Sequence, residues 1–528
     1  MKKLFASLVF LALAMSGGQA AADTPKDTLV MAYQIDDIIT LDPAEIFEFT
    51  AAEYAGNTYL RLIGYDVNDV SNIFGVAAES WTISDDGKTY TFKMRDGVKF
   101  ASGNPMTAED AAFSLQRAII LDKSPAFILT QFGFTKENVK EKIRATDAST
   151  LVLETDQAYA PTFVLYCLTA TISSVVDMKL VMEHETGGDL GHAWMRTNYA
   201  GGGPFKLVEW RANEALTLER NDNYYGEKPA MKRVVIRYIP ESGTQRVLLE
   251  KGDIDMARNL GSDDLAGIKG NADVKTDQGV KGAIYYLGLN QKNPNLAKPE
   301  VRQALKYLVD YQGIAETILA GRATVHQAFL PKGFLGALED KPFKLDVAKA
   351  KELLAAAGLP DGFTVTMDTR NTSPIMDMAQ AIQGNFAQAG IKLEIIPGDG
   401  KQTLTKYRAR NHDIYIGRWG PDYQDPHTNA DTFARNPDNA DDAKSKPLAW
   451  RNAWDIPEMT KEADAAVLER DAGKRSDLYL KIEREHQQVS PFVIMFQETE
   501  VTAMRKNVNG FVIGPSFDDN KYNGVTKN

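Results

Sequence analysis

The chain has 528 residues, of which 44% are hydrophobic and 25% are charged, an ordinary composition for a globular protein. Its 60 basic and 71 acidic residues give a formal net charge of −11, and no segment is dense in Lys and Arg. Phosphate binding needs clustered cations, so this composition argues against a nucleic-acid partner. The length predicts two or three folding units, since a unit has roughly 150 residues.

The N-terminal segment has the layout of a cleavable signal peptide. Lys2 and Lys3 precede an apolar run from Leu4 to Met15, and small residues follow at positions 20–22. This run of about a dozen residues is too short for a membrane span, which needs roughly 20. We therefore expect residues 1–22 to be removed and the mature chain to be exported.

The single cysteine, Cys167, lies far from this cleavage region. No thiol is then available near the new N-terminus for lipid attachment, which favours a free periplasmic protein over a lipoprotein. One cysteine also excludes an internal disulfide, so stability must come from a large buried core. Because apolar residues 163–166 precede it, we expect Cys167 to be buried as a small hydrophobic side chain.

Two local patterns in the first part of the chain predict a hairpin and a helix. Residues 80–83 and 89–95 flank the turn sequence at 84–87, and the second segment alternates apolar and polar residues, which favours a β-hairpin. Thr107 and Asp110 have the spacing of a capping box before an apolar stretch. A helix should therefore begin there.

The glycine-rich segment at residues 201–203 precedes Pro204-Phe-Lys-Leu207. We predict a turn that leads into a strand. A phosphate-binding loop would need a Lys-Ser/Thr pair and a following helix, and this segment has neither.

Helix and strand patterns alternate between residues 346 and 425. A helix at 346–357 should end at Gly358. A β-α-β unit follows, with a strand at 363–367, a helix at 374–388 and a strand at 391–396, and then a helix at 403–409 and a strand at 412–417. Crossover connections of this kind make the strands parallel.

Arg370 and Asp422 each follow one of these strands by a few residues. Ligands of open α/β sheets lie beside the carboxyl ends of the strands, so both charges should lie on one rim. A guanidinium and a carboxylate held apart on that rim complement a zwitterion. The alternative is that both are ordinary surface charges. Trp419, just before Asp422, either belongs to the core or lines a pocket.

The most specific similarity to a known family lies in residues 78–110, Ala78-Glu-Ser-Trp-Thr-Ile-Ser-Asp-Asp-Gly-Lys-Thr-Tyr-Thr-Phe-Lys-Met-Arg-Asp-Gly-Val-Lys-Phe100 with Gly103-Asn-Pro-Met-Thr-Ala-Glu-Asp110. With these residues the chain resembles bacterial extracellular solute-binding protein family 5, the dipeptide- and oligopeptide-binding proteins of ABC transporters. The resemblance continues through residues 41–43, 203–210, 252–255, 287–290 and 301–305.

The resemblance implies an α/β fold with two lobes, a type II periplasmic binding protein of cluster C. Lobe I would hold residues 23–284 with an extra subdomain and would be completed by residues 498–528. Lobe II would hold residues 285–497. The hinge would consist of two chain crossings, near residues 285–290 and 492–497.

The resemblance also implies roles for individual residues. Asp422, in the Trp-x-x-Asp sequence that begins at Trp419, would receive the ammonium of a peptide. Arg370 would receive the peptide carboxylate, although its alignment needs a gap of one residue.

The positions after Leu41-Asp-Pro43 depart from those of the usual peptide binders. Phe47, Glu48 and Phe49 would present backbone to the bound peptide, and their two aromatic rings and acid would narrow the pocket toward a particular small ligand. Arg418 either meets an anionic group of the ligand or is a solvated or lobe-bridging cation. Tyr423 is a further candidate ligand-binding residue.

The function implied is the periplasmic substrate-binding component of an ABC importer. It would capture a small zwitterionic ligand, a di- or oligopeptide, by hinge closure and deliver it to an inner-membrane permease, as a monomer. The alternative is the same scaffold with a non-peptide ligand such as an opine, a glycoside, or a nickel or other metal chelate. Chaperone or chemoreceptor-docking roles would use the same fold.

Motifs of other classes are missing from the sequence. It has no Gly-x-Ser-x-Gly elbow and no His-Glu-x-x-His, so we expect no enzyme activity and no cofactor. His184 and His192 lie eight residues apart, and four further histidines are scattered without ligand spacing, as is typical of surface residues. We therefore predict no metal site.

Overall fold

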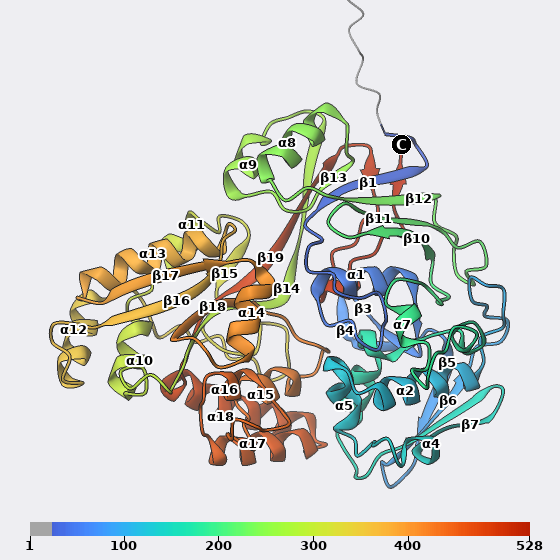
Figure 1. Ribbon diagram of the computed structural model, residues 1–528, viewed down its shortest axis with the longest axis horizontal. Helices are drawn as coiled ribbons and strands as arrows, with labels where there is room; N and C mark the ends of the chain where they lie inside the picture. The colour runs from blue at the N-terminus through green and yellow to red at the C-terminus, as the bar shows by residue number, and fades with distance from the viewer. Residues whose placement is uncertain (1–23) are drawn as a thin grey trace, which may run out of the picture.

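The structure is a computed structural model that describes residues 24–528 (Figure 1). The predicted signal peptide, residues 1–22, lies outside the described residues. We use the names lobe I and lobe II for the ranges predicted above. None of the helices within residues 24–528 combines the length and the apolar character that crossing a bilayer requires.

One 11-stranded sheet runs through both lobes, in the order β10-β11-β12-β1-β13-β19-β14-β18-β16-β17, with β15 paired to β19. Its lobe I strands are β1 (Thr28–Tyr33), β10 (Phe205–Arg211), β11 (Ala215–Arg220), β12 (Arg233–Tyr238) and β13 (Met256–Ala257). Its lobe II strands are β15 (Ala323–Val325), β16 (Thr364–Arg370), β17 (Lys392–Gly398) and β18 (Ile414–Trp419). The strand predicted after the glycines at 201–203 is β10, which confirms that prediction.

Two long antiparallel strands, β14 (Val274–Leu289) and β19 (Phe492–Arg505), join the lobes, as Figure 1 shows. Residues 281–289 of β14 are all buried, because this part of the strand has neighbours on both sides and cores on both faces. The register of the pair shifts between Val280 and Ile284. The predicted crossings at 285–290 and 492–497 overlap these strands, and the shift lies next to the predicted boundary at residue 284.

The remainder of lobe I packs helices and small sheets around two large hydrophobic cores. β5 (Ala78–Ile83) and β6 (Thr89–Met94) form the predicted antiparallel hairpin. The capping box at Thr107 and Asp110 is present and opens α2 (Ala108–Leu121), as predicted. Cys167 is fully buried in α5 (Pro161–Leu168), which confirms its expected place in the core.

The other elements of lobe I are short. The helices are α1 (Phe49–Thr58), α3 (Phe127–Thr130), α4 (Val139–Lys142), α6 (Met178–Met182), α7 (His192–Met195), α8 (Ser242–Lys251) and α9 (Ser262–Gly267). The strands are β2 (Leu60–Arg61), β3 (Ile63–Asp66), β4 (Asp69–Gly75), β7 (Ile143–Asp147), β8 (Thr150–Glu154), β9 (Ser174–Val175), β20 (Val508–Asn509) and β21 (Thr526–Lys527).

Lobe II contains the predicted β-α-β unit. α13 (Ile375–Gln388) connects β16 to β17, α14 (Gly400–Arg408) connects β17 to β18, and β16 pairs in parallel with both strands. α12 (Val347–Ala356) precedes them, and Gly358 has the positive φ of 78° that is typical of a helix C-terminal cap. The strand, helix and crossover predictions for this segment are therefore confirmed.

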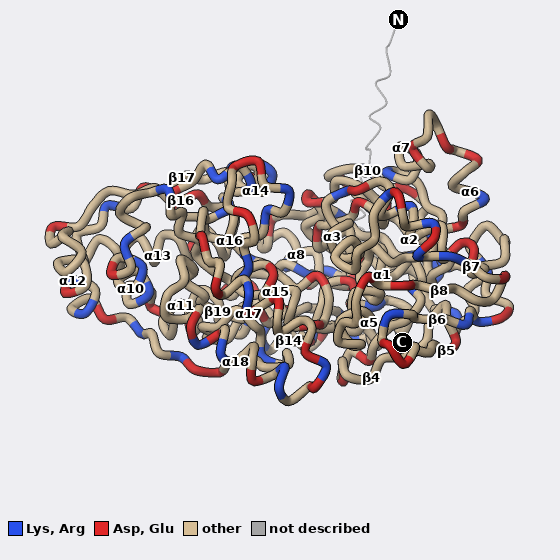
Figure 2. Tube along the Cα trace, turned by 90° about the horizontal axis from the view of Figure 1, so that it is seen from below, with Lys and Arg blue, Asp and Glu red and all other residues tan. Residues whose placement is uncertain are grey.

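The other helices of lobe II are α10 (Pro299–Lys306), α11 (Tyr311–Glu316), α15 (His427–Phe433), α16 (Leu448–Arg451), α17 (Pro457–Leu468) and α18 (Ala472–Val489). The expectation that the scattered histidines lie at the surface is wrong, because His326, His412, His427 and His486 are all buried. In Figure 2 basic and acidic residues are interspersed over both lobes.

Candidate functional site

Asp422 lies three residues beyond the carboxyl end of β18. Its backbone N–H donates to Thr428 Oγ1 at 3.1 Å, which ties the loop to the first turn of α15. Among residues 24–528 no cationic nitrogen lies within 4.0 Å of its carboxylate. Burial, with a smaller contribution from the nearby Asp431, raises the pKa of Asp422 to about 7 against the lowering effect of Arg451. The side chain is therefore an acceptor that lacks a cation.

Arg370 is the last residue of β16, and the parallel pairing of β16 with β18 places it at the same sheet edge as Asp422. Its guanidinium lies against Gly400, where an added Cβ would overlap it. Within the described part of the chain no carboxylate oxygen lies within 4.0 Å of this group. Arg370 and Asp422 therefore lie at one sheet edge, as predicted from the strand order, and neither has an ion-pair partner among residues 24–528.

Trp419, the last residue of β18, is half-buried, and its contacts are those of the core role considered for it. Its ring packs edge-on against Phe433, with 5.4 Å between centroids, and adjoins a hydrophobic core of lobe II.

Phe47, Glu48 and Phe49 lie at the start of α1 in lobe I. Glu48 is the N-cap residue, with an extended backbone at φ −111° and ψ 149°. Its carboxylate accepts a hydrogen bond from the N–H of Phe47 at 3.3 Å. Burial raises the pKa of Glu48 to about 7. The Phe47 ring packs edge-on against Phe127, with 6.0 Å between centroids.

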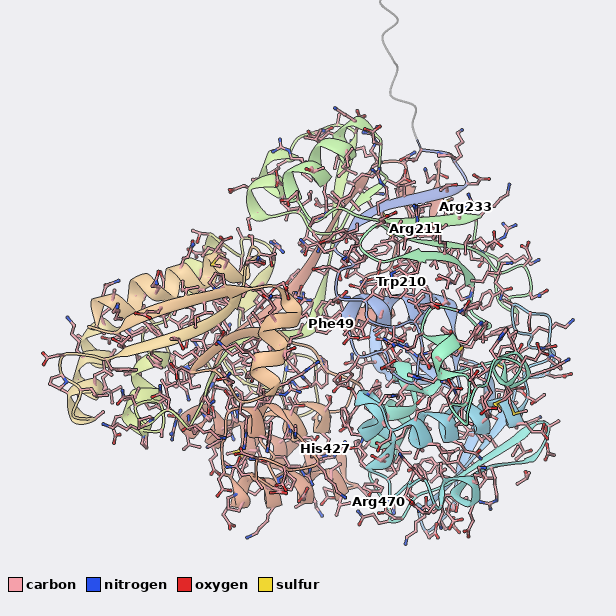
Figure 3. The ribbon with its side chains drawn as sticks, viewed as in Figure 1. Phe49, Trp210, Arg211, Arg233, His427 and Arg470 are labelled. Atoms are coloured by element: carbon pink, nitrogen blue, oxygen red, sulfur yellow. The ribbon has the colours of Figure 1, made fainter. Side chains whose placement is uncertain are left out.

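Arg418 bridges the lobes, the second of the two roles considered for it. Its Nη1 lies 2.8 Å from Glu498 of β19. The guanidinium carbon lies 4.6 Å from the ring centroid of Phe49 and 5.0 Å from that of Phe517, both in lobe I. Figure 3 shows Phe49 at the boundary between the lobes. Because Glu498 already neutralises Arg418, this cation is not free as Arg370 is.

Tyr423 points into lobe I. Only 4% of the residue is exposed, and its ring lies 5.9 Å from that of Phe163 in α5. His427 packs on the same phenylalanine at 5.1 Å, and Figure 3 shows it at the lower part of the lobe boundary. No partner for the Tyr423 hydroxyl is found among residues 24–528. The structure thus places Tyr423 in an interlobe contact.

Three charged residues that the sequence analysis did not single out face this region. Asp37 of lobe I lies near Arg370, Arg408 of α14 lies near Glu48, and Arg451 of α16 lies near Asp422. Nothing in their local sequence marks them, because the sheet and helices bring them together only in three dimensions.

In the described part of the chain no group of three His, Cys, Asp or Glu side chains is arranged to hold a metal ion. A surface hollow of about 510 Å³ lies on α18 and is lined by Asp340, Lys341, Pro342, Arg484, Gln487 and Gln488.

Known proteins resemble this chain in both sequence and fold. The family model described as bacterial extracellular solute-binding proteins, family 5 middle, matches residues 72–441. The probable D,D-dipeptide-binding periplasmic protein DdpA of Escherichia coli K12 is 30% identical over 519 residues, which cover 97% of this chain and 96% of that protein. The glutathione-binding protein GsiB of Salmonella typhi is 26% identical over 525 residues, covering 97% and 98%.

A solved structure of DppA from Helicobacter pylori, an ABC transporter-associated periplasmic binding protein in complex with the peptide STSA, superposes with a TM-score of 0.82. It is 24% identical and covers 95% of this chain and 98% of its own. The structure of AgaA from A. tumefacien R10 in complex with agropinic acid superposes with a TM-score of 0.79 at 24% identity, covering 95% and 99%. The two-lobed α/β fold is thus that of periplasmic binding proteins, and the chain belongs to the bacterial extracellular solute-binding proteins of family 5.

Proposed function

We propose that this solute-binding protein is the periplasmic component of an ABC importer and that it captures a small zwitterionic ligand, a di- or oligopeptide. The family supports the transport role, since its members are substrate-binding proteins and not enzymes. The names of the relatives, a D,D-dipeptide binder and a glutathione binder, support a peptide-like ligand. One observation carries the ligand class: an unpaired carboxylate and an unpaired guanidinium share one sheet edge of lobe II.

Asp422 receives the ligand ammonium in this proposal. A carboxylate without a partner in a partly dry site loses solvation and gains nothing in return, which is why its pKa is high in the empty protein. A ligand ammonium supplies the missing charge and lowers that pKa again. The ion pair with the ligand ammonium therefore offsets the desolvation of the Asp422 carboxylate, which the empty protein leaves uncompensated.

Arg370 receives the ligand carboxylate. Its guanidinium is held by packing against Gly400, so little side-chain freedom is lost when a carboxylate pairs with it. Asp37 of lobe I interacts with Arg370 only through a longer-range charge effect, since no oxygen of the Asp37 side chain comes within 4.0 Å of the guanidinium. Arg370 is thus available to a ligand.

Closure of the lobes completes the site. Phe47 to Phe49 belong to lobe I, whereas Arg370 and Asp422 belong to lobe II, so a ligand held on lobe II stabilises the closed form by contacts with lobe I. The strands β14 and β19, with their register shift next to residue 284, supply the hinge. The closed, occupied form is the one delivered to the inner-membrane permease.

Native mass spectrometry of the exported protein, followed by denaturing release, tests the ligand class. We expect a co-purified small molecule with a free amine and a carboxylate, or binding of added dipeptides by the empty protein. Release of an opine, a glycoside or a metal chelate, together with no binding of any peptide, would replace the proposed ligand and leave the transport role in place.

A further inference from the structure

Three arginines of lobe II, Arg370 of β16, Arg408 of α14 and Arg451 of α16, come from elements that meet at one aromatic pair. Tyr407 of α14 and Tyr415 of β18 are stacked, with 4.0 Å between centroids and 11° between ring planes. The Arg451 guanidinium carbon lies 5.6 Å from the Tyr407 centroid. Burial raises the pKa of the Tyr415 hydroxyl, and the positive charges of Arg370, Arg451 and Arg408 all act against that shift. We call these three residues the arginine row.

The arginine row lacks carboxylate partners. Among residues 24–528 none of its guanidinium groups has a carboxylate oxygen within 4.0 Å. Two buried or half-buried arginines of the same lobe are paired: Arg475 contacts Asp425 at 2.7 Å, and Arg435 contacts Asp464 at 2.6 Å.

Arg408 is exposed and Arg370 and Arg451 are half-buried, so a ligand can reach each guanidinium. The pKa of Arg408 is lowered by desolvation and by the like charge of Arg451. Three neighbouring cations in this state attract any anion that reaches them.

The row is continuous with the proposed ligand site. Arg370 lies at the carboxyl end of β16, and the charge of Arg451 acts on Asp422. A ligand whose ammonium lies on Asp422 therefore extends its other groups toward arginines. One terminal carboxylate pairs with one guanidinium and leaves two of the three unused.

Two acids of lobe I face the row and offer an alternative role for it. Glu48 and Asp37 could pair with Arg408 and Arg370 when the lobes close. Both acids already accept backbone hydrogen bonds, Glu48 from Phe47 and Asp37 from Thr50, each at 3.3 Å. The third acid near the row, Asp422 beside Arg451, is the one assigned to the ligand ammonium, so Arg451 remains for a ligand even if both pairs form.

We propose that the arginine row selects ligands with two or more carboxylates, so that the preferred ligand is a short peptide with an acidic side chain. This inference rests on the proposed function, since it assumes a peptide ammonium on Asp422. Bidentate pairing between guanidinium and carboxylate supplies the selectivity. A ligand with a side-chain amide in place of the carboxylate carries no negative charge and cannot form this bidentate ion pair.

Calorimetric titration with matched dipeptides tests the inference. The panel pairs Ala-Glu with Ala-Gln and Glu-Ala with Gln-Ala, at pH 8. In the unmodified protein we expect the acidic member of at least one pair to bind tenfold tighter or more. Arg408→Gln should abolish that preference and leave the affinity for the neutral member within about twofold.

Arg484→Gln is the matched control, because Arg484 is an exposed arginine of the same lobe on the hollow at α18. Arg484→Gln should retain the preference for the acidic peptide.

Glu48→Gln tests the alternative role of the row. If Arg408 serves only to pair with Glu48, then Arg408→Gln and Glu48→Gln will weaken acidic and neutral peptides equally, and the inference is overturned.

The remaining outcomes separate this inference from the proposed function. Equal affinities of the unmodified protein within every matched pair overturn the inference and leave the proposed function standing. Failure of every dipeptide in the panel to bind overturns the inference and excludes dipeptides as the ligand of the proposed function.

Discussion

Replacement of Asp422 by Asn should raise the stability of the empty protein and lower its affinity for the ligand. The pKa of this carboxyl is raised from 3.8 to about 7, mainly by burial. At about 1.4 kcal/mol per pH unit, the charged form of Asp422 lowers the free energy of unfolding by up to about 4 kcal/mol. The cost is smaller because Asp422 is only half-buried and solvent still reaches it. Asn keeps the shape and removes that cost.

The sign follows from the direction of the shift. Since the pKa of Asp422 is higher in the folded state, the unfolded chain releases this proton first, and folded stability is lost as pH rises from about 4 to about 7. Thermal unfolding of the empty protein should therefore show a higher Tm for Asp422→Asn at pH 8, with the difference shrinking toward pH 4. Asp431→Asn is unsuitable as a control, because Arg435 already pairs with Asp431 at 3.0 Å.

Calorimetry supplies the second half of this test. The ammonium of a bound dipeptide would lie against a neutral amide in Asp422→Asn, which should weaken binding by roughly 2 to 5 kcal/mol. The two effects have opposite signs, so simple misfolding cannot produce both. An unchanged Tm at pH 8 together with unchanged affinity would refute the reasoning and remove Asp422 from the site.

Further predictions concern the pH dependence of affinity, the role of Arg370, and the contacts that Tyr423 and Arg418 make between the lobes. Affinity for a zwitterionic dipeptide should fall about tenfold per unit below pH 7 in calorimetry, because Asp422 must first release its proton; a flat profile between pH 6 and 8 would contradict this. Arg370→Gln should weaken a free dipeptide at least tenfold but barely affect its C-terminal amide. Tyr423→Phe should leave affinity and Tm nearly unchanged, since the hydroxyl has no partner among residues 24–528. Arg418→Gln should lower Tm by leaving Glu498 buried without its cation, at a cost of about 2–3 kcal/mol, and an unaltered Tm would rule out that role.

Local patterns in the sequence were sufficient to predict much of the fold. The alternation of residues 89–95 and the capping box at Thr107 each predict an element that the structure contains. Periodicity between residues 346 and 417 predicts parallel strands, and their carboxyl ends place Arg370 and Asp422 on one edge. These features depend on short-range sequence and on a general rule of sheet topology, so no long-range contact had to be known.

The parts that were not predicted depend on contacts between distant residues. Arg418 is paired with Glu498, 80 residues further along the chain, and its local sequence gives no indication of that partner. Tyr423 follows Asp422 directly, yet it packs on Phe163 in the other lobe. The buried histidines were mistaken for surface residues because a neutral imidazole can be buried as an aromatic ring, as with His427 on Phe163.

The most direct test of the account compares one dipeptide in three forms, free, N-acetylated and C-amidated, in calorimetric titrations at pH 8. We expect micromolar or tighter binding of the free dipeptide. We also expect at least tenfold weaker binding on acetylation, through Asp422, and on amidation, through Arg370. Binding that survives both modifications would contradict recognition of the two ligand charges by these residues.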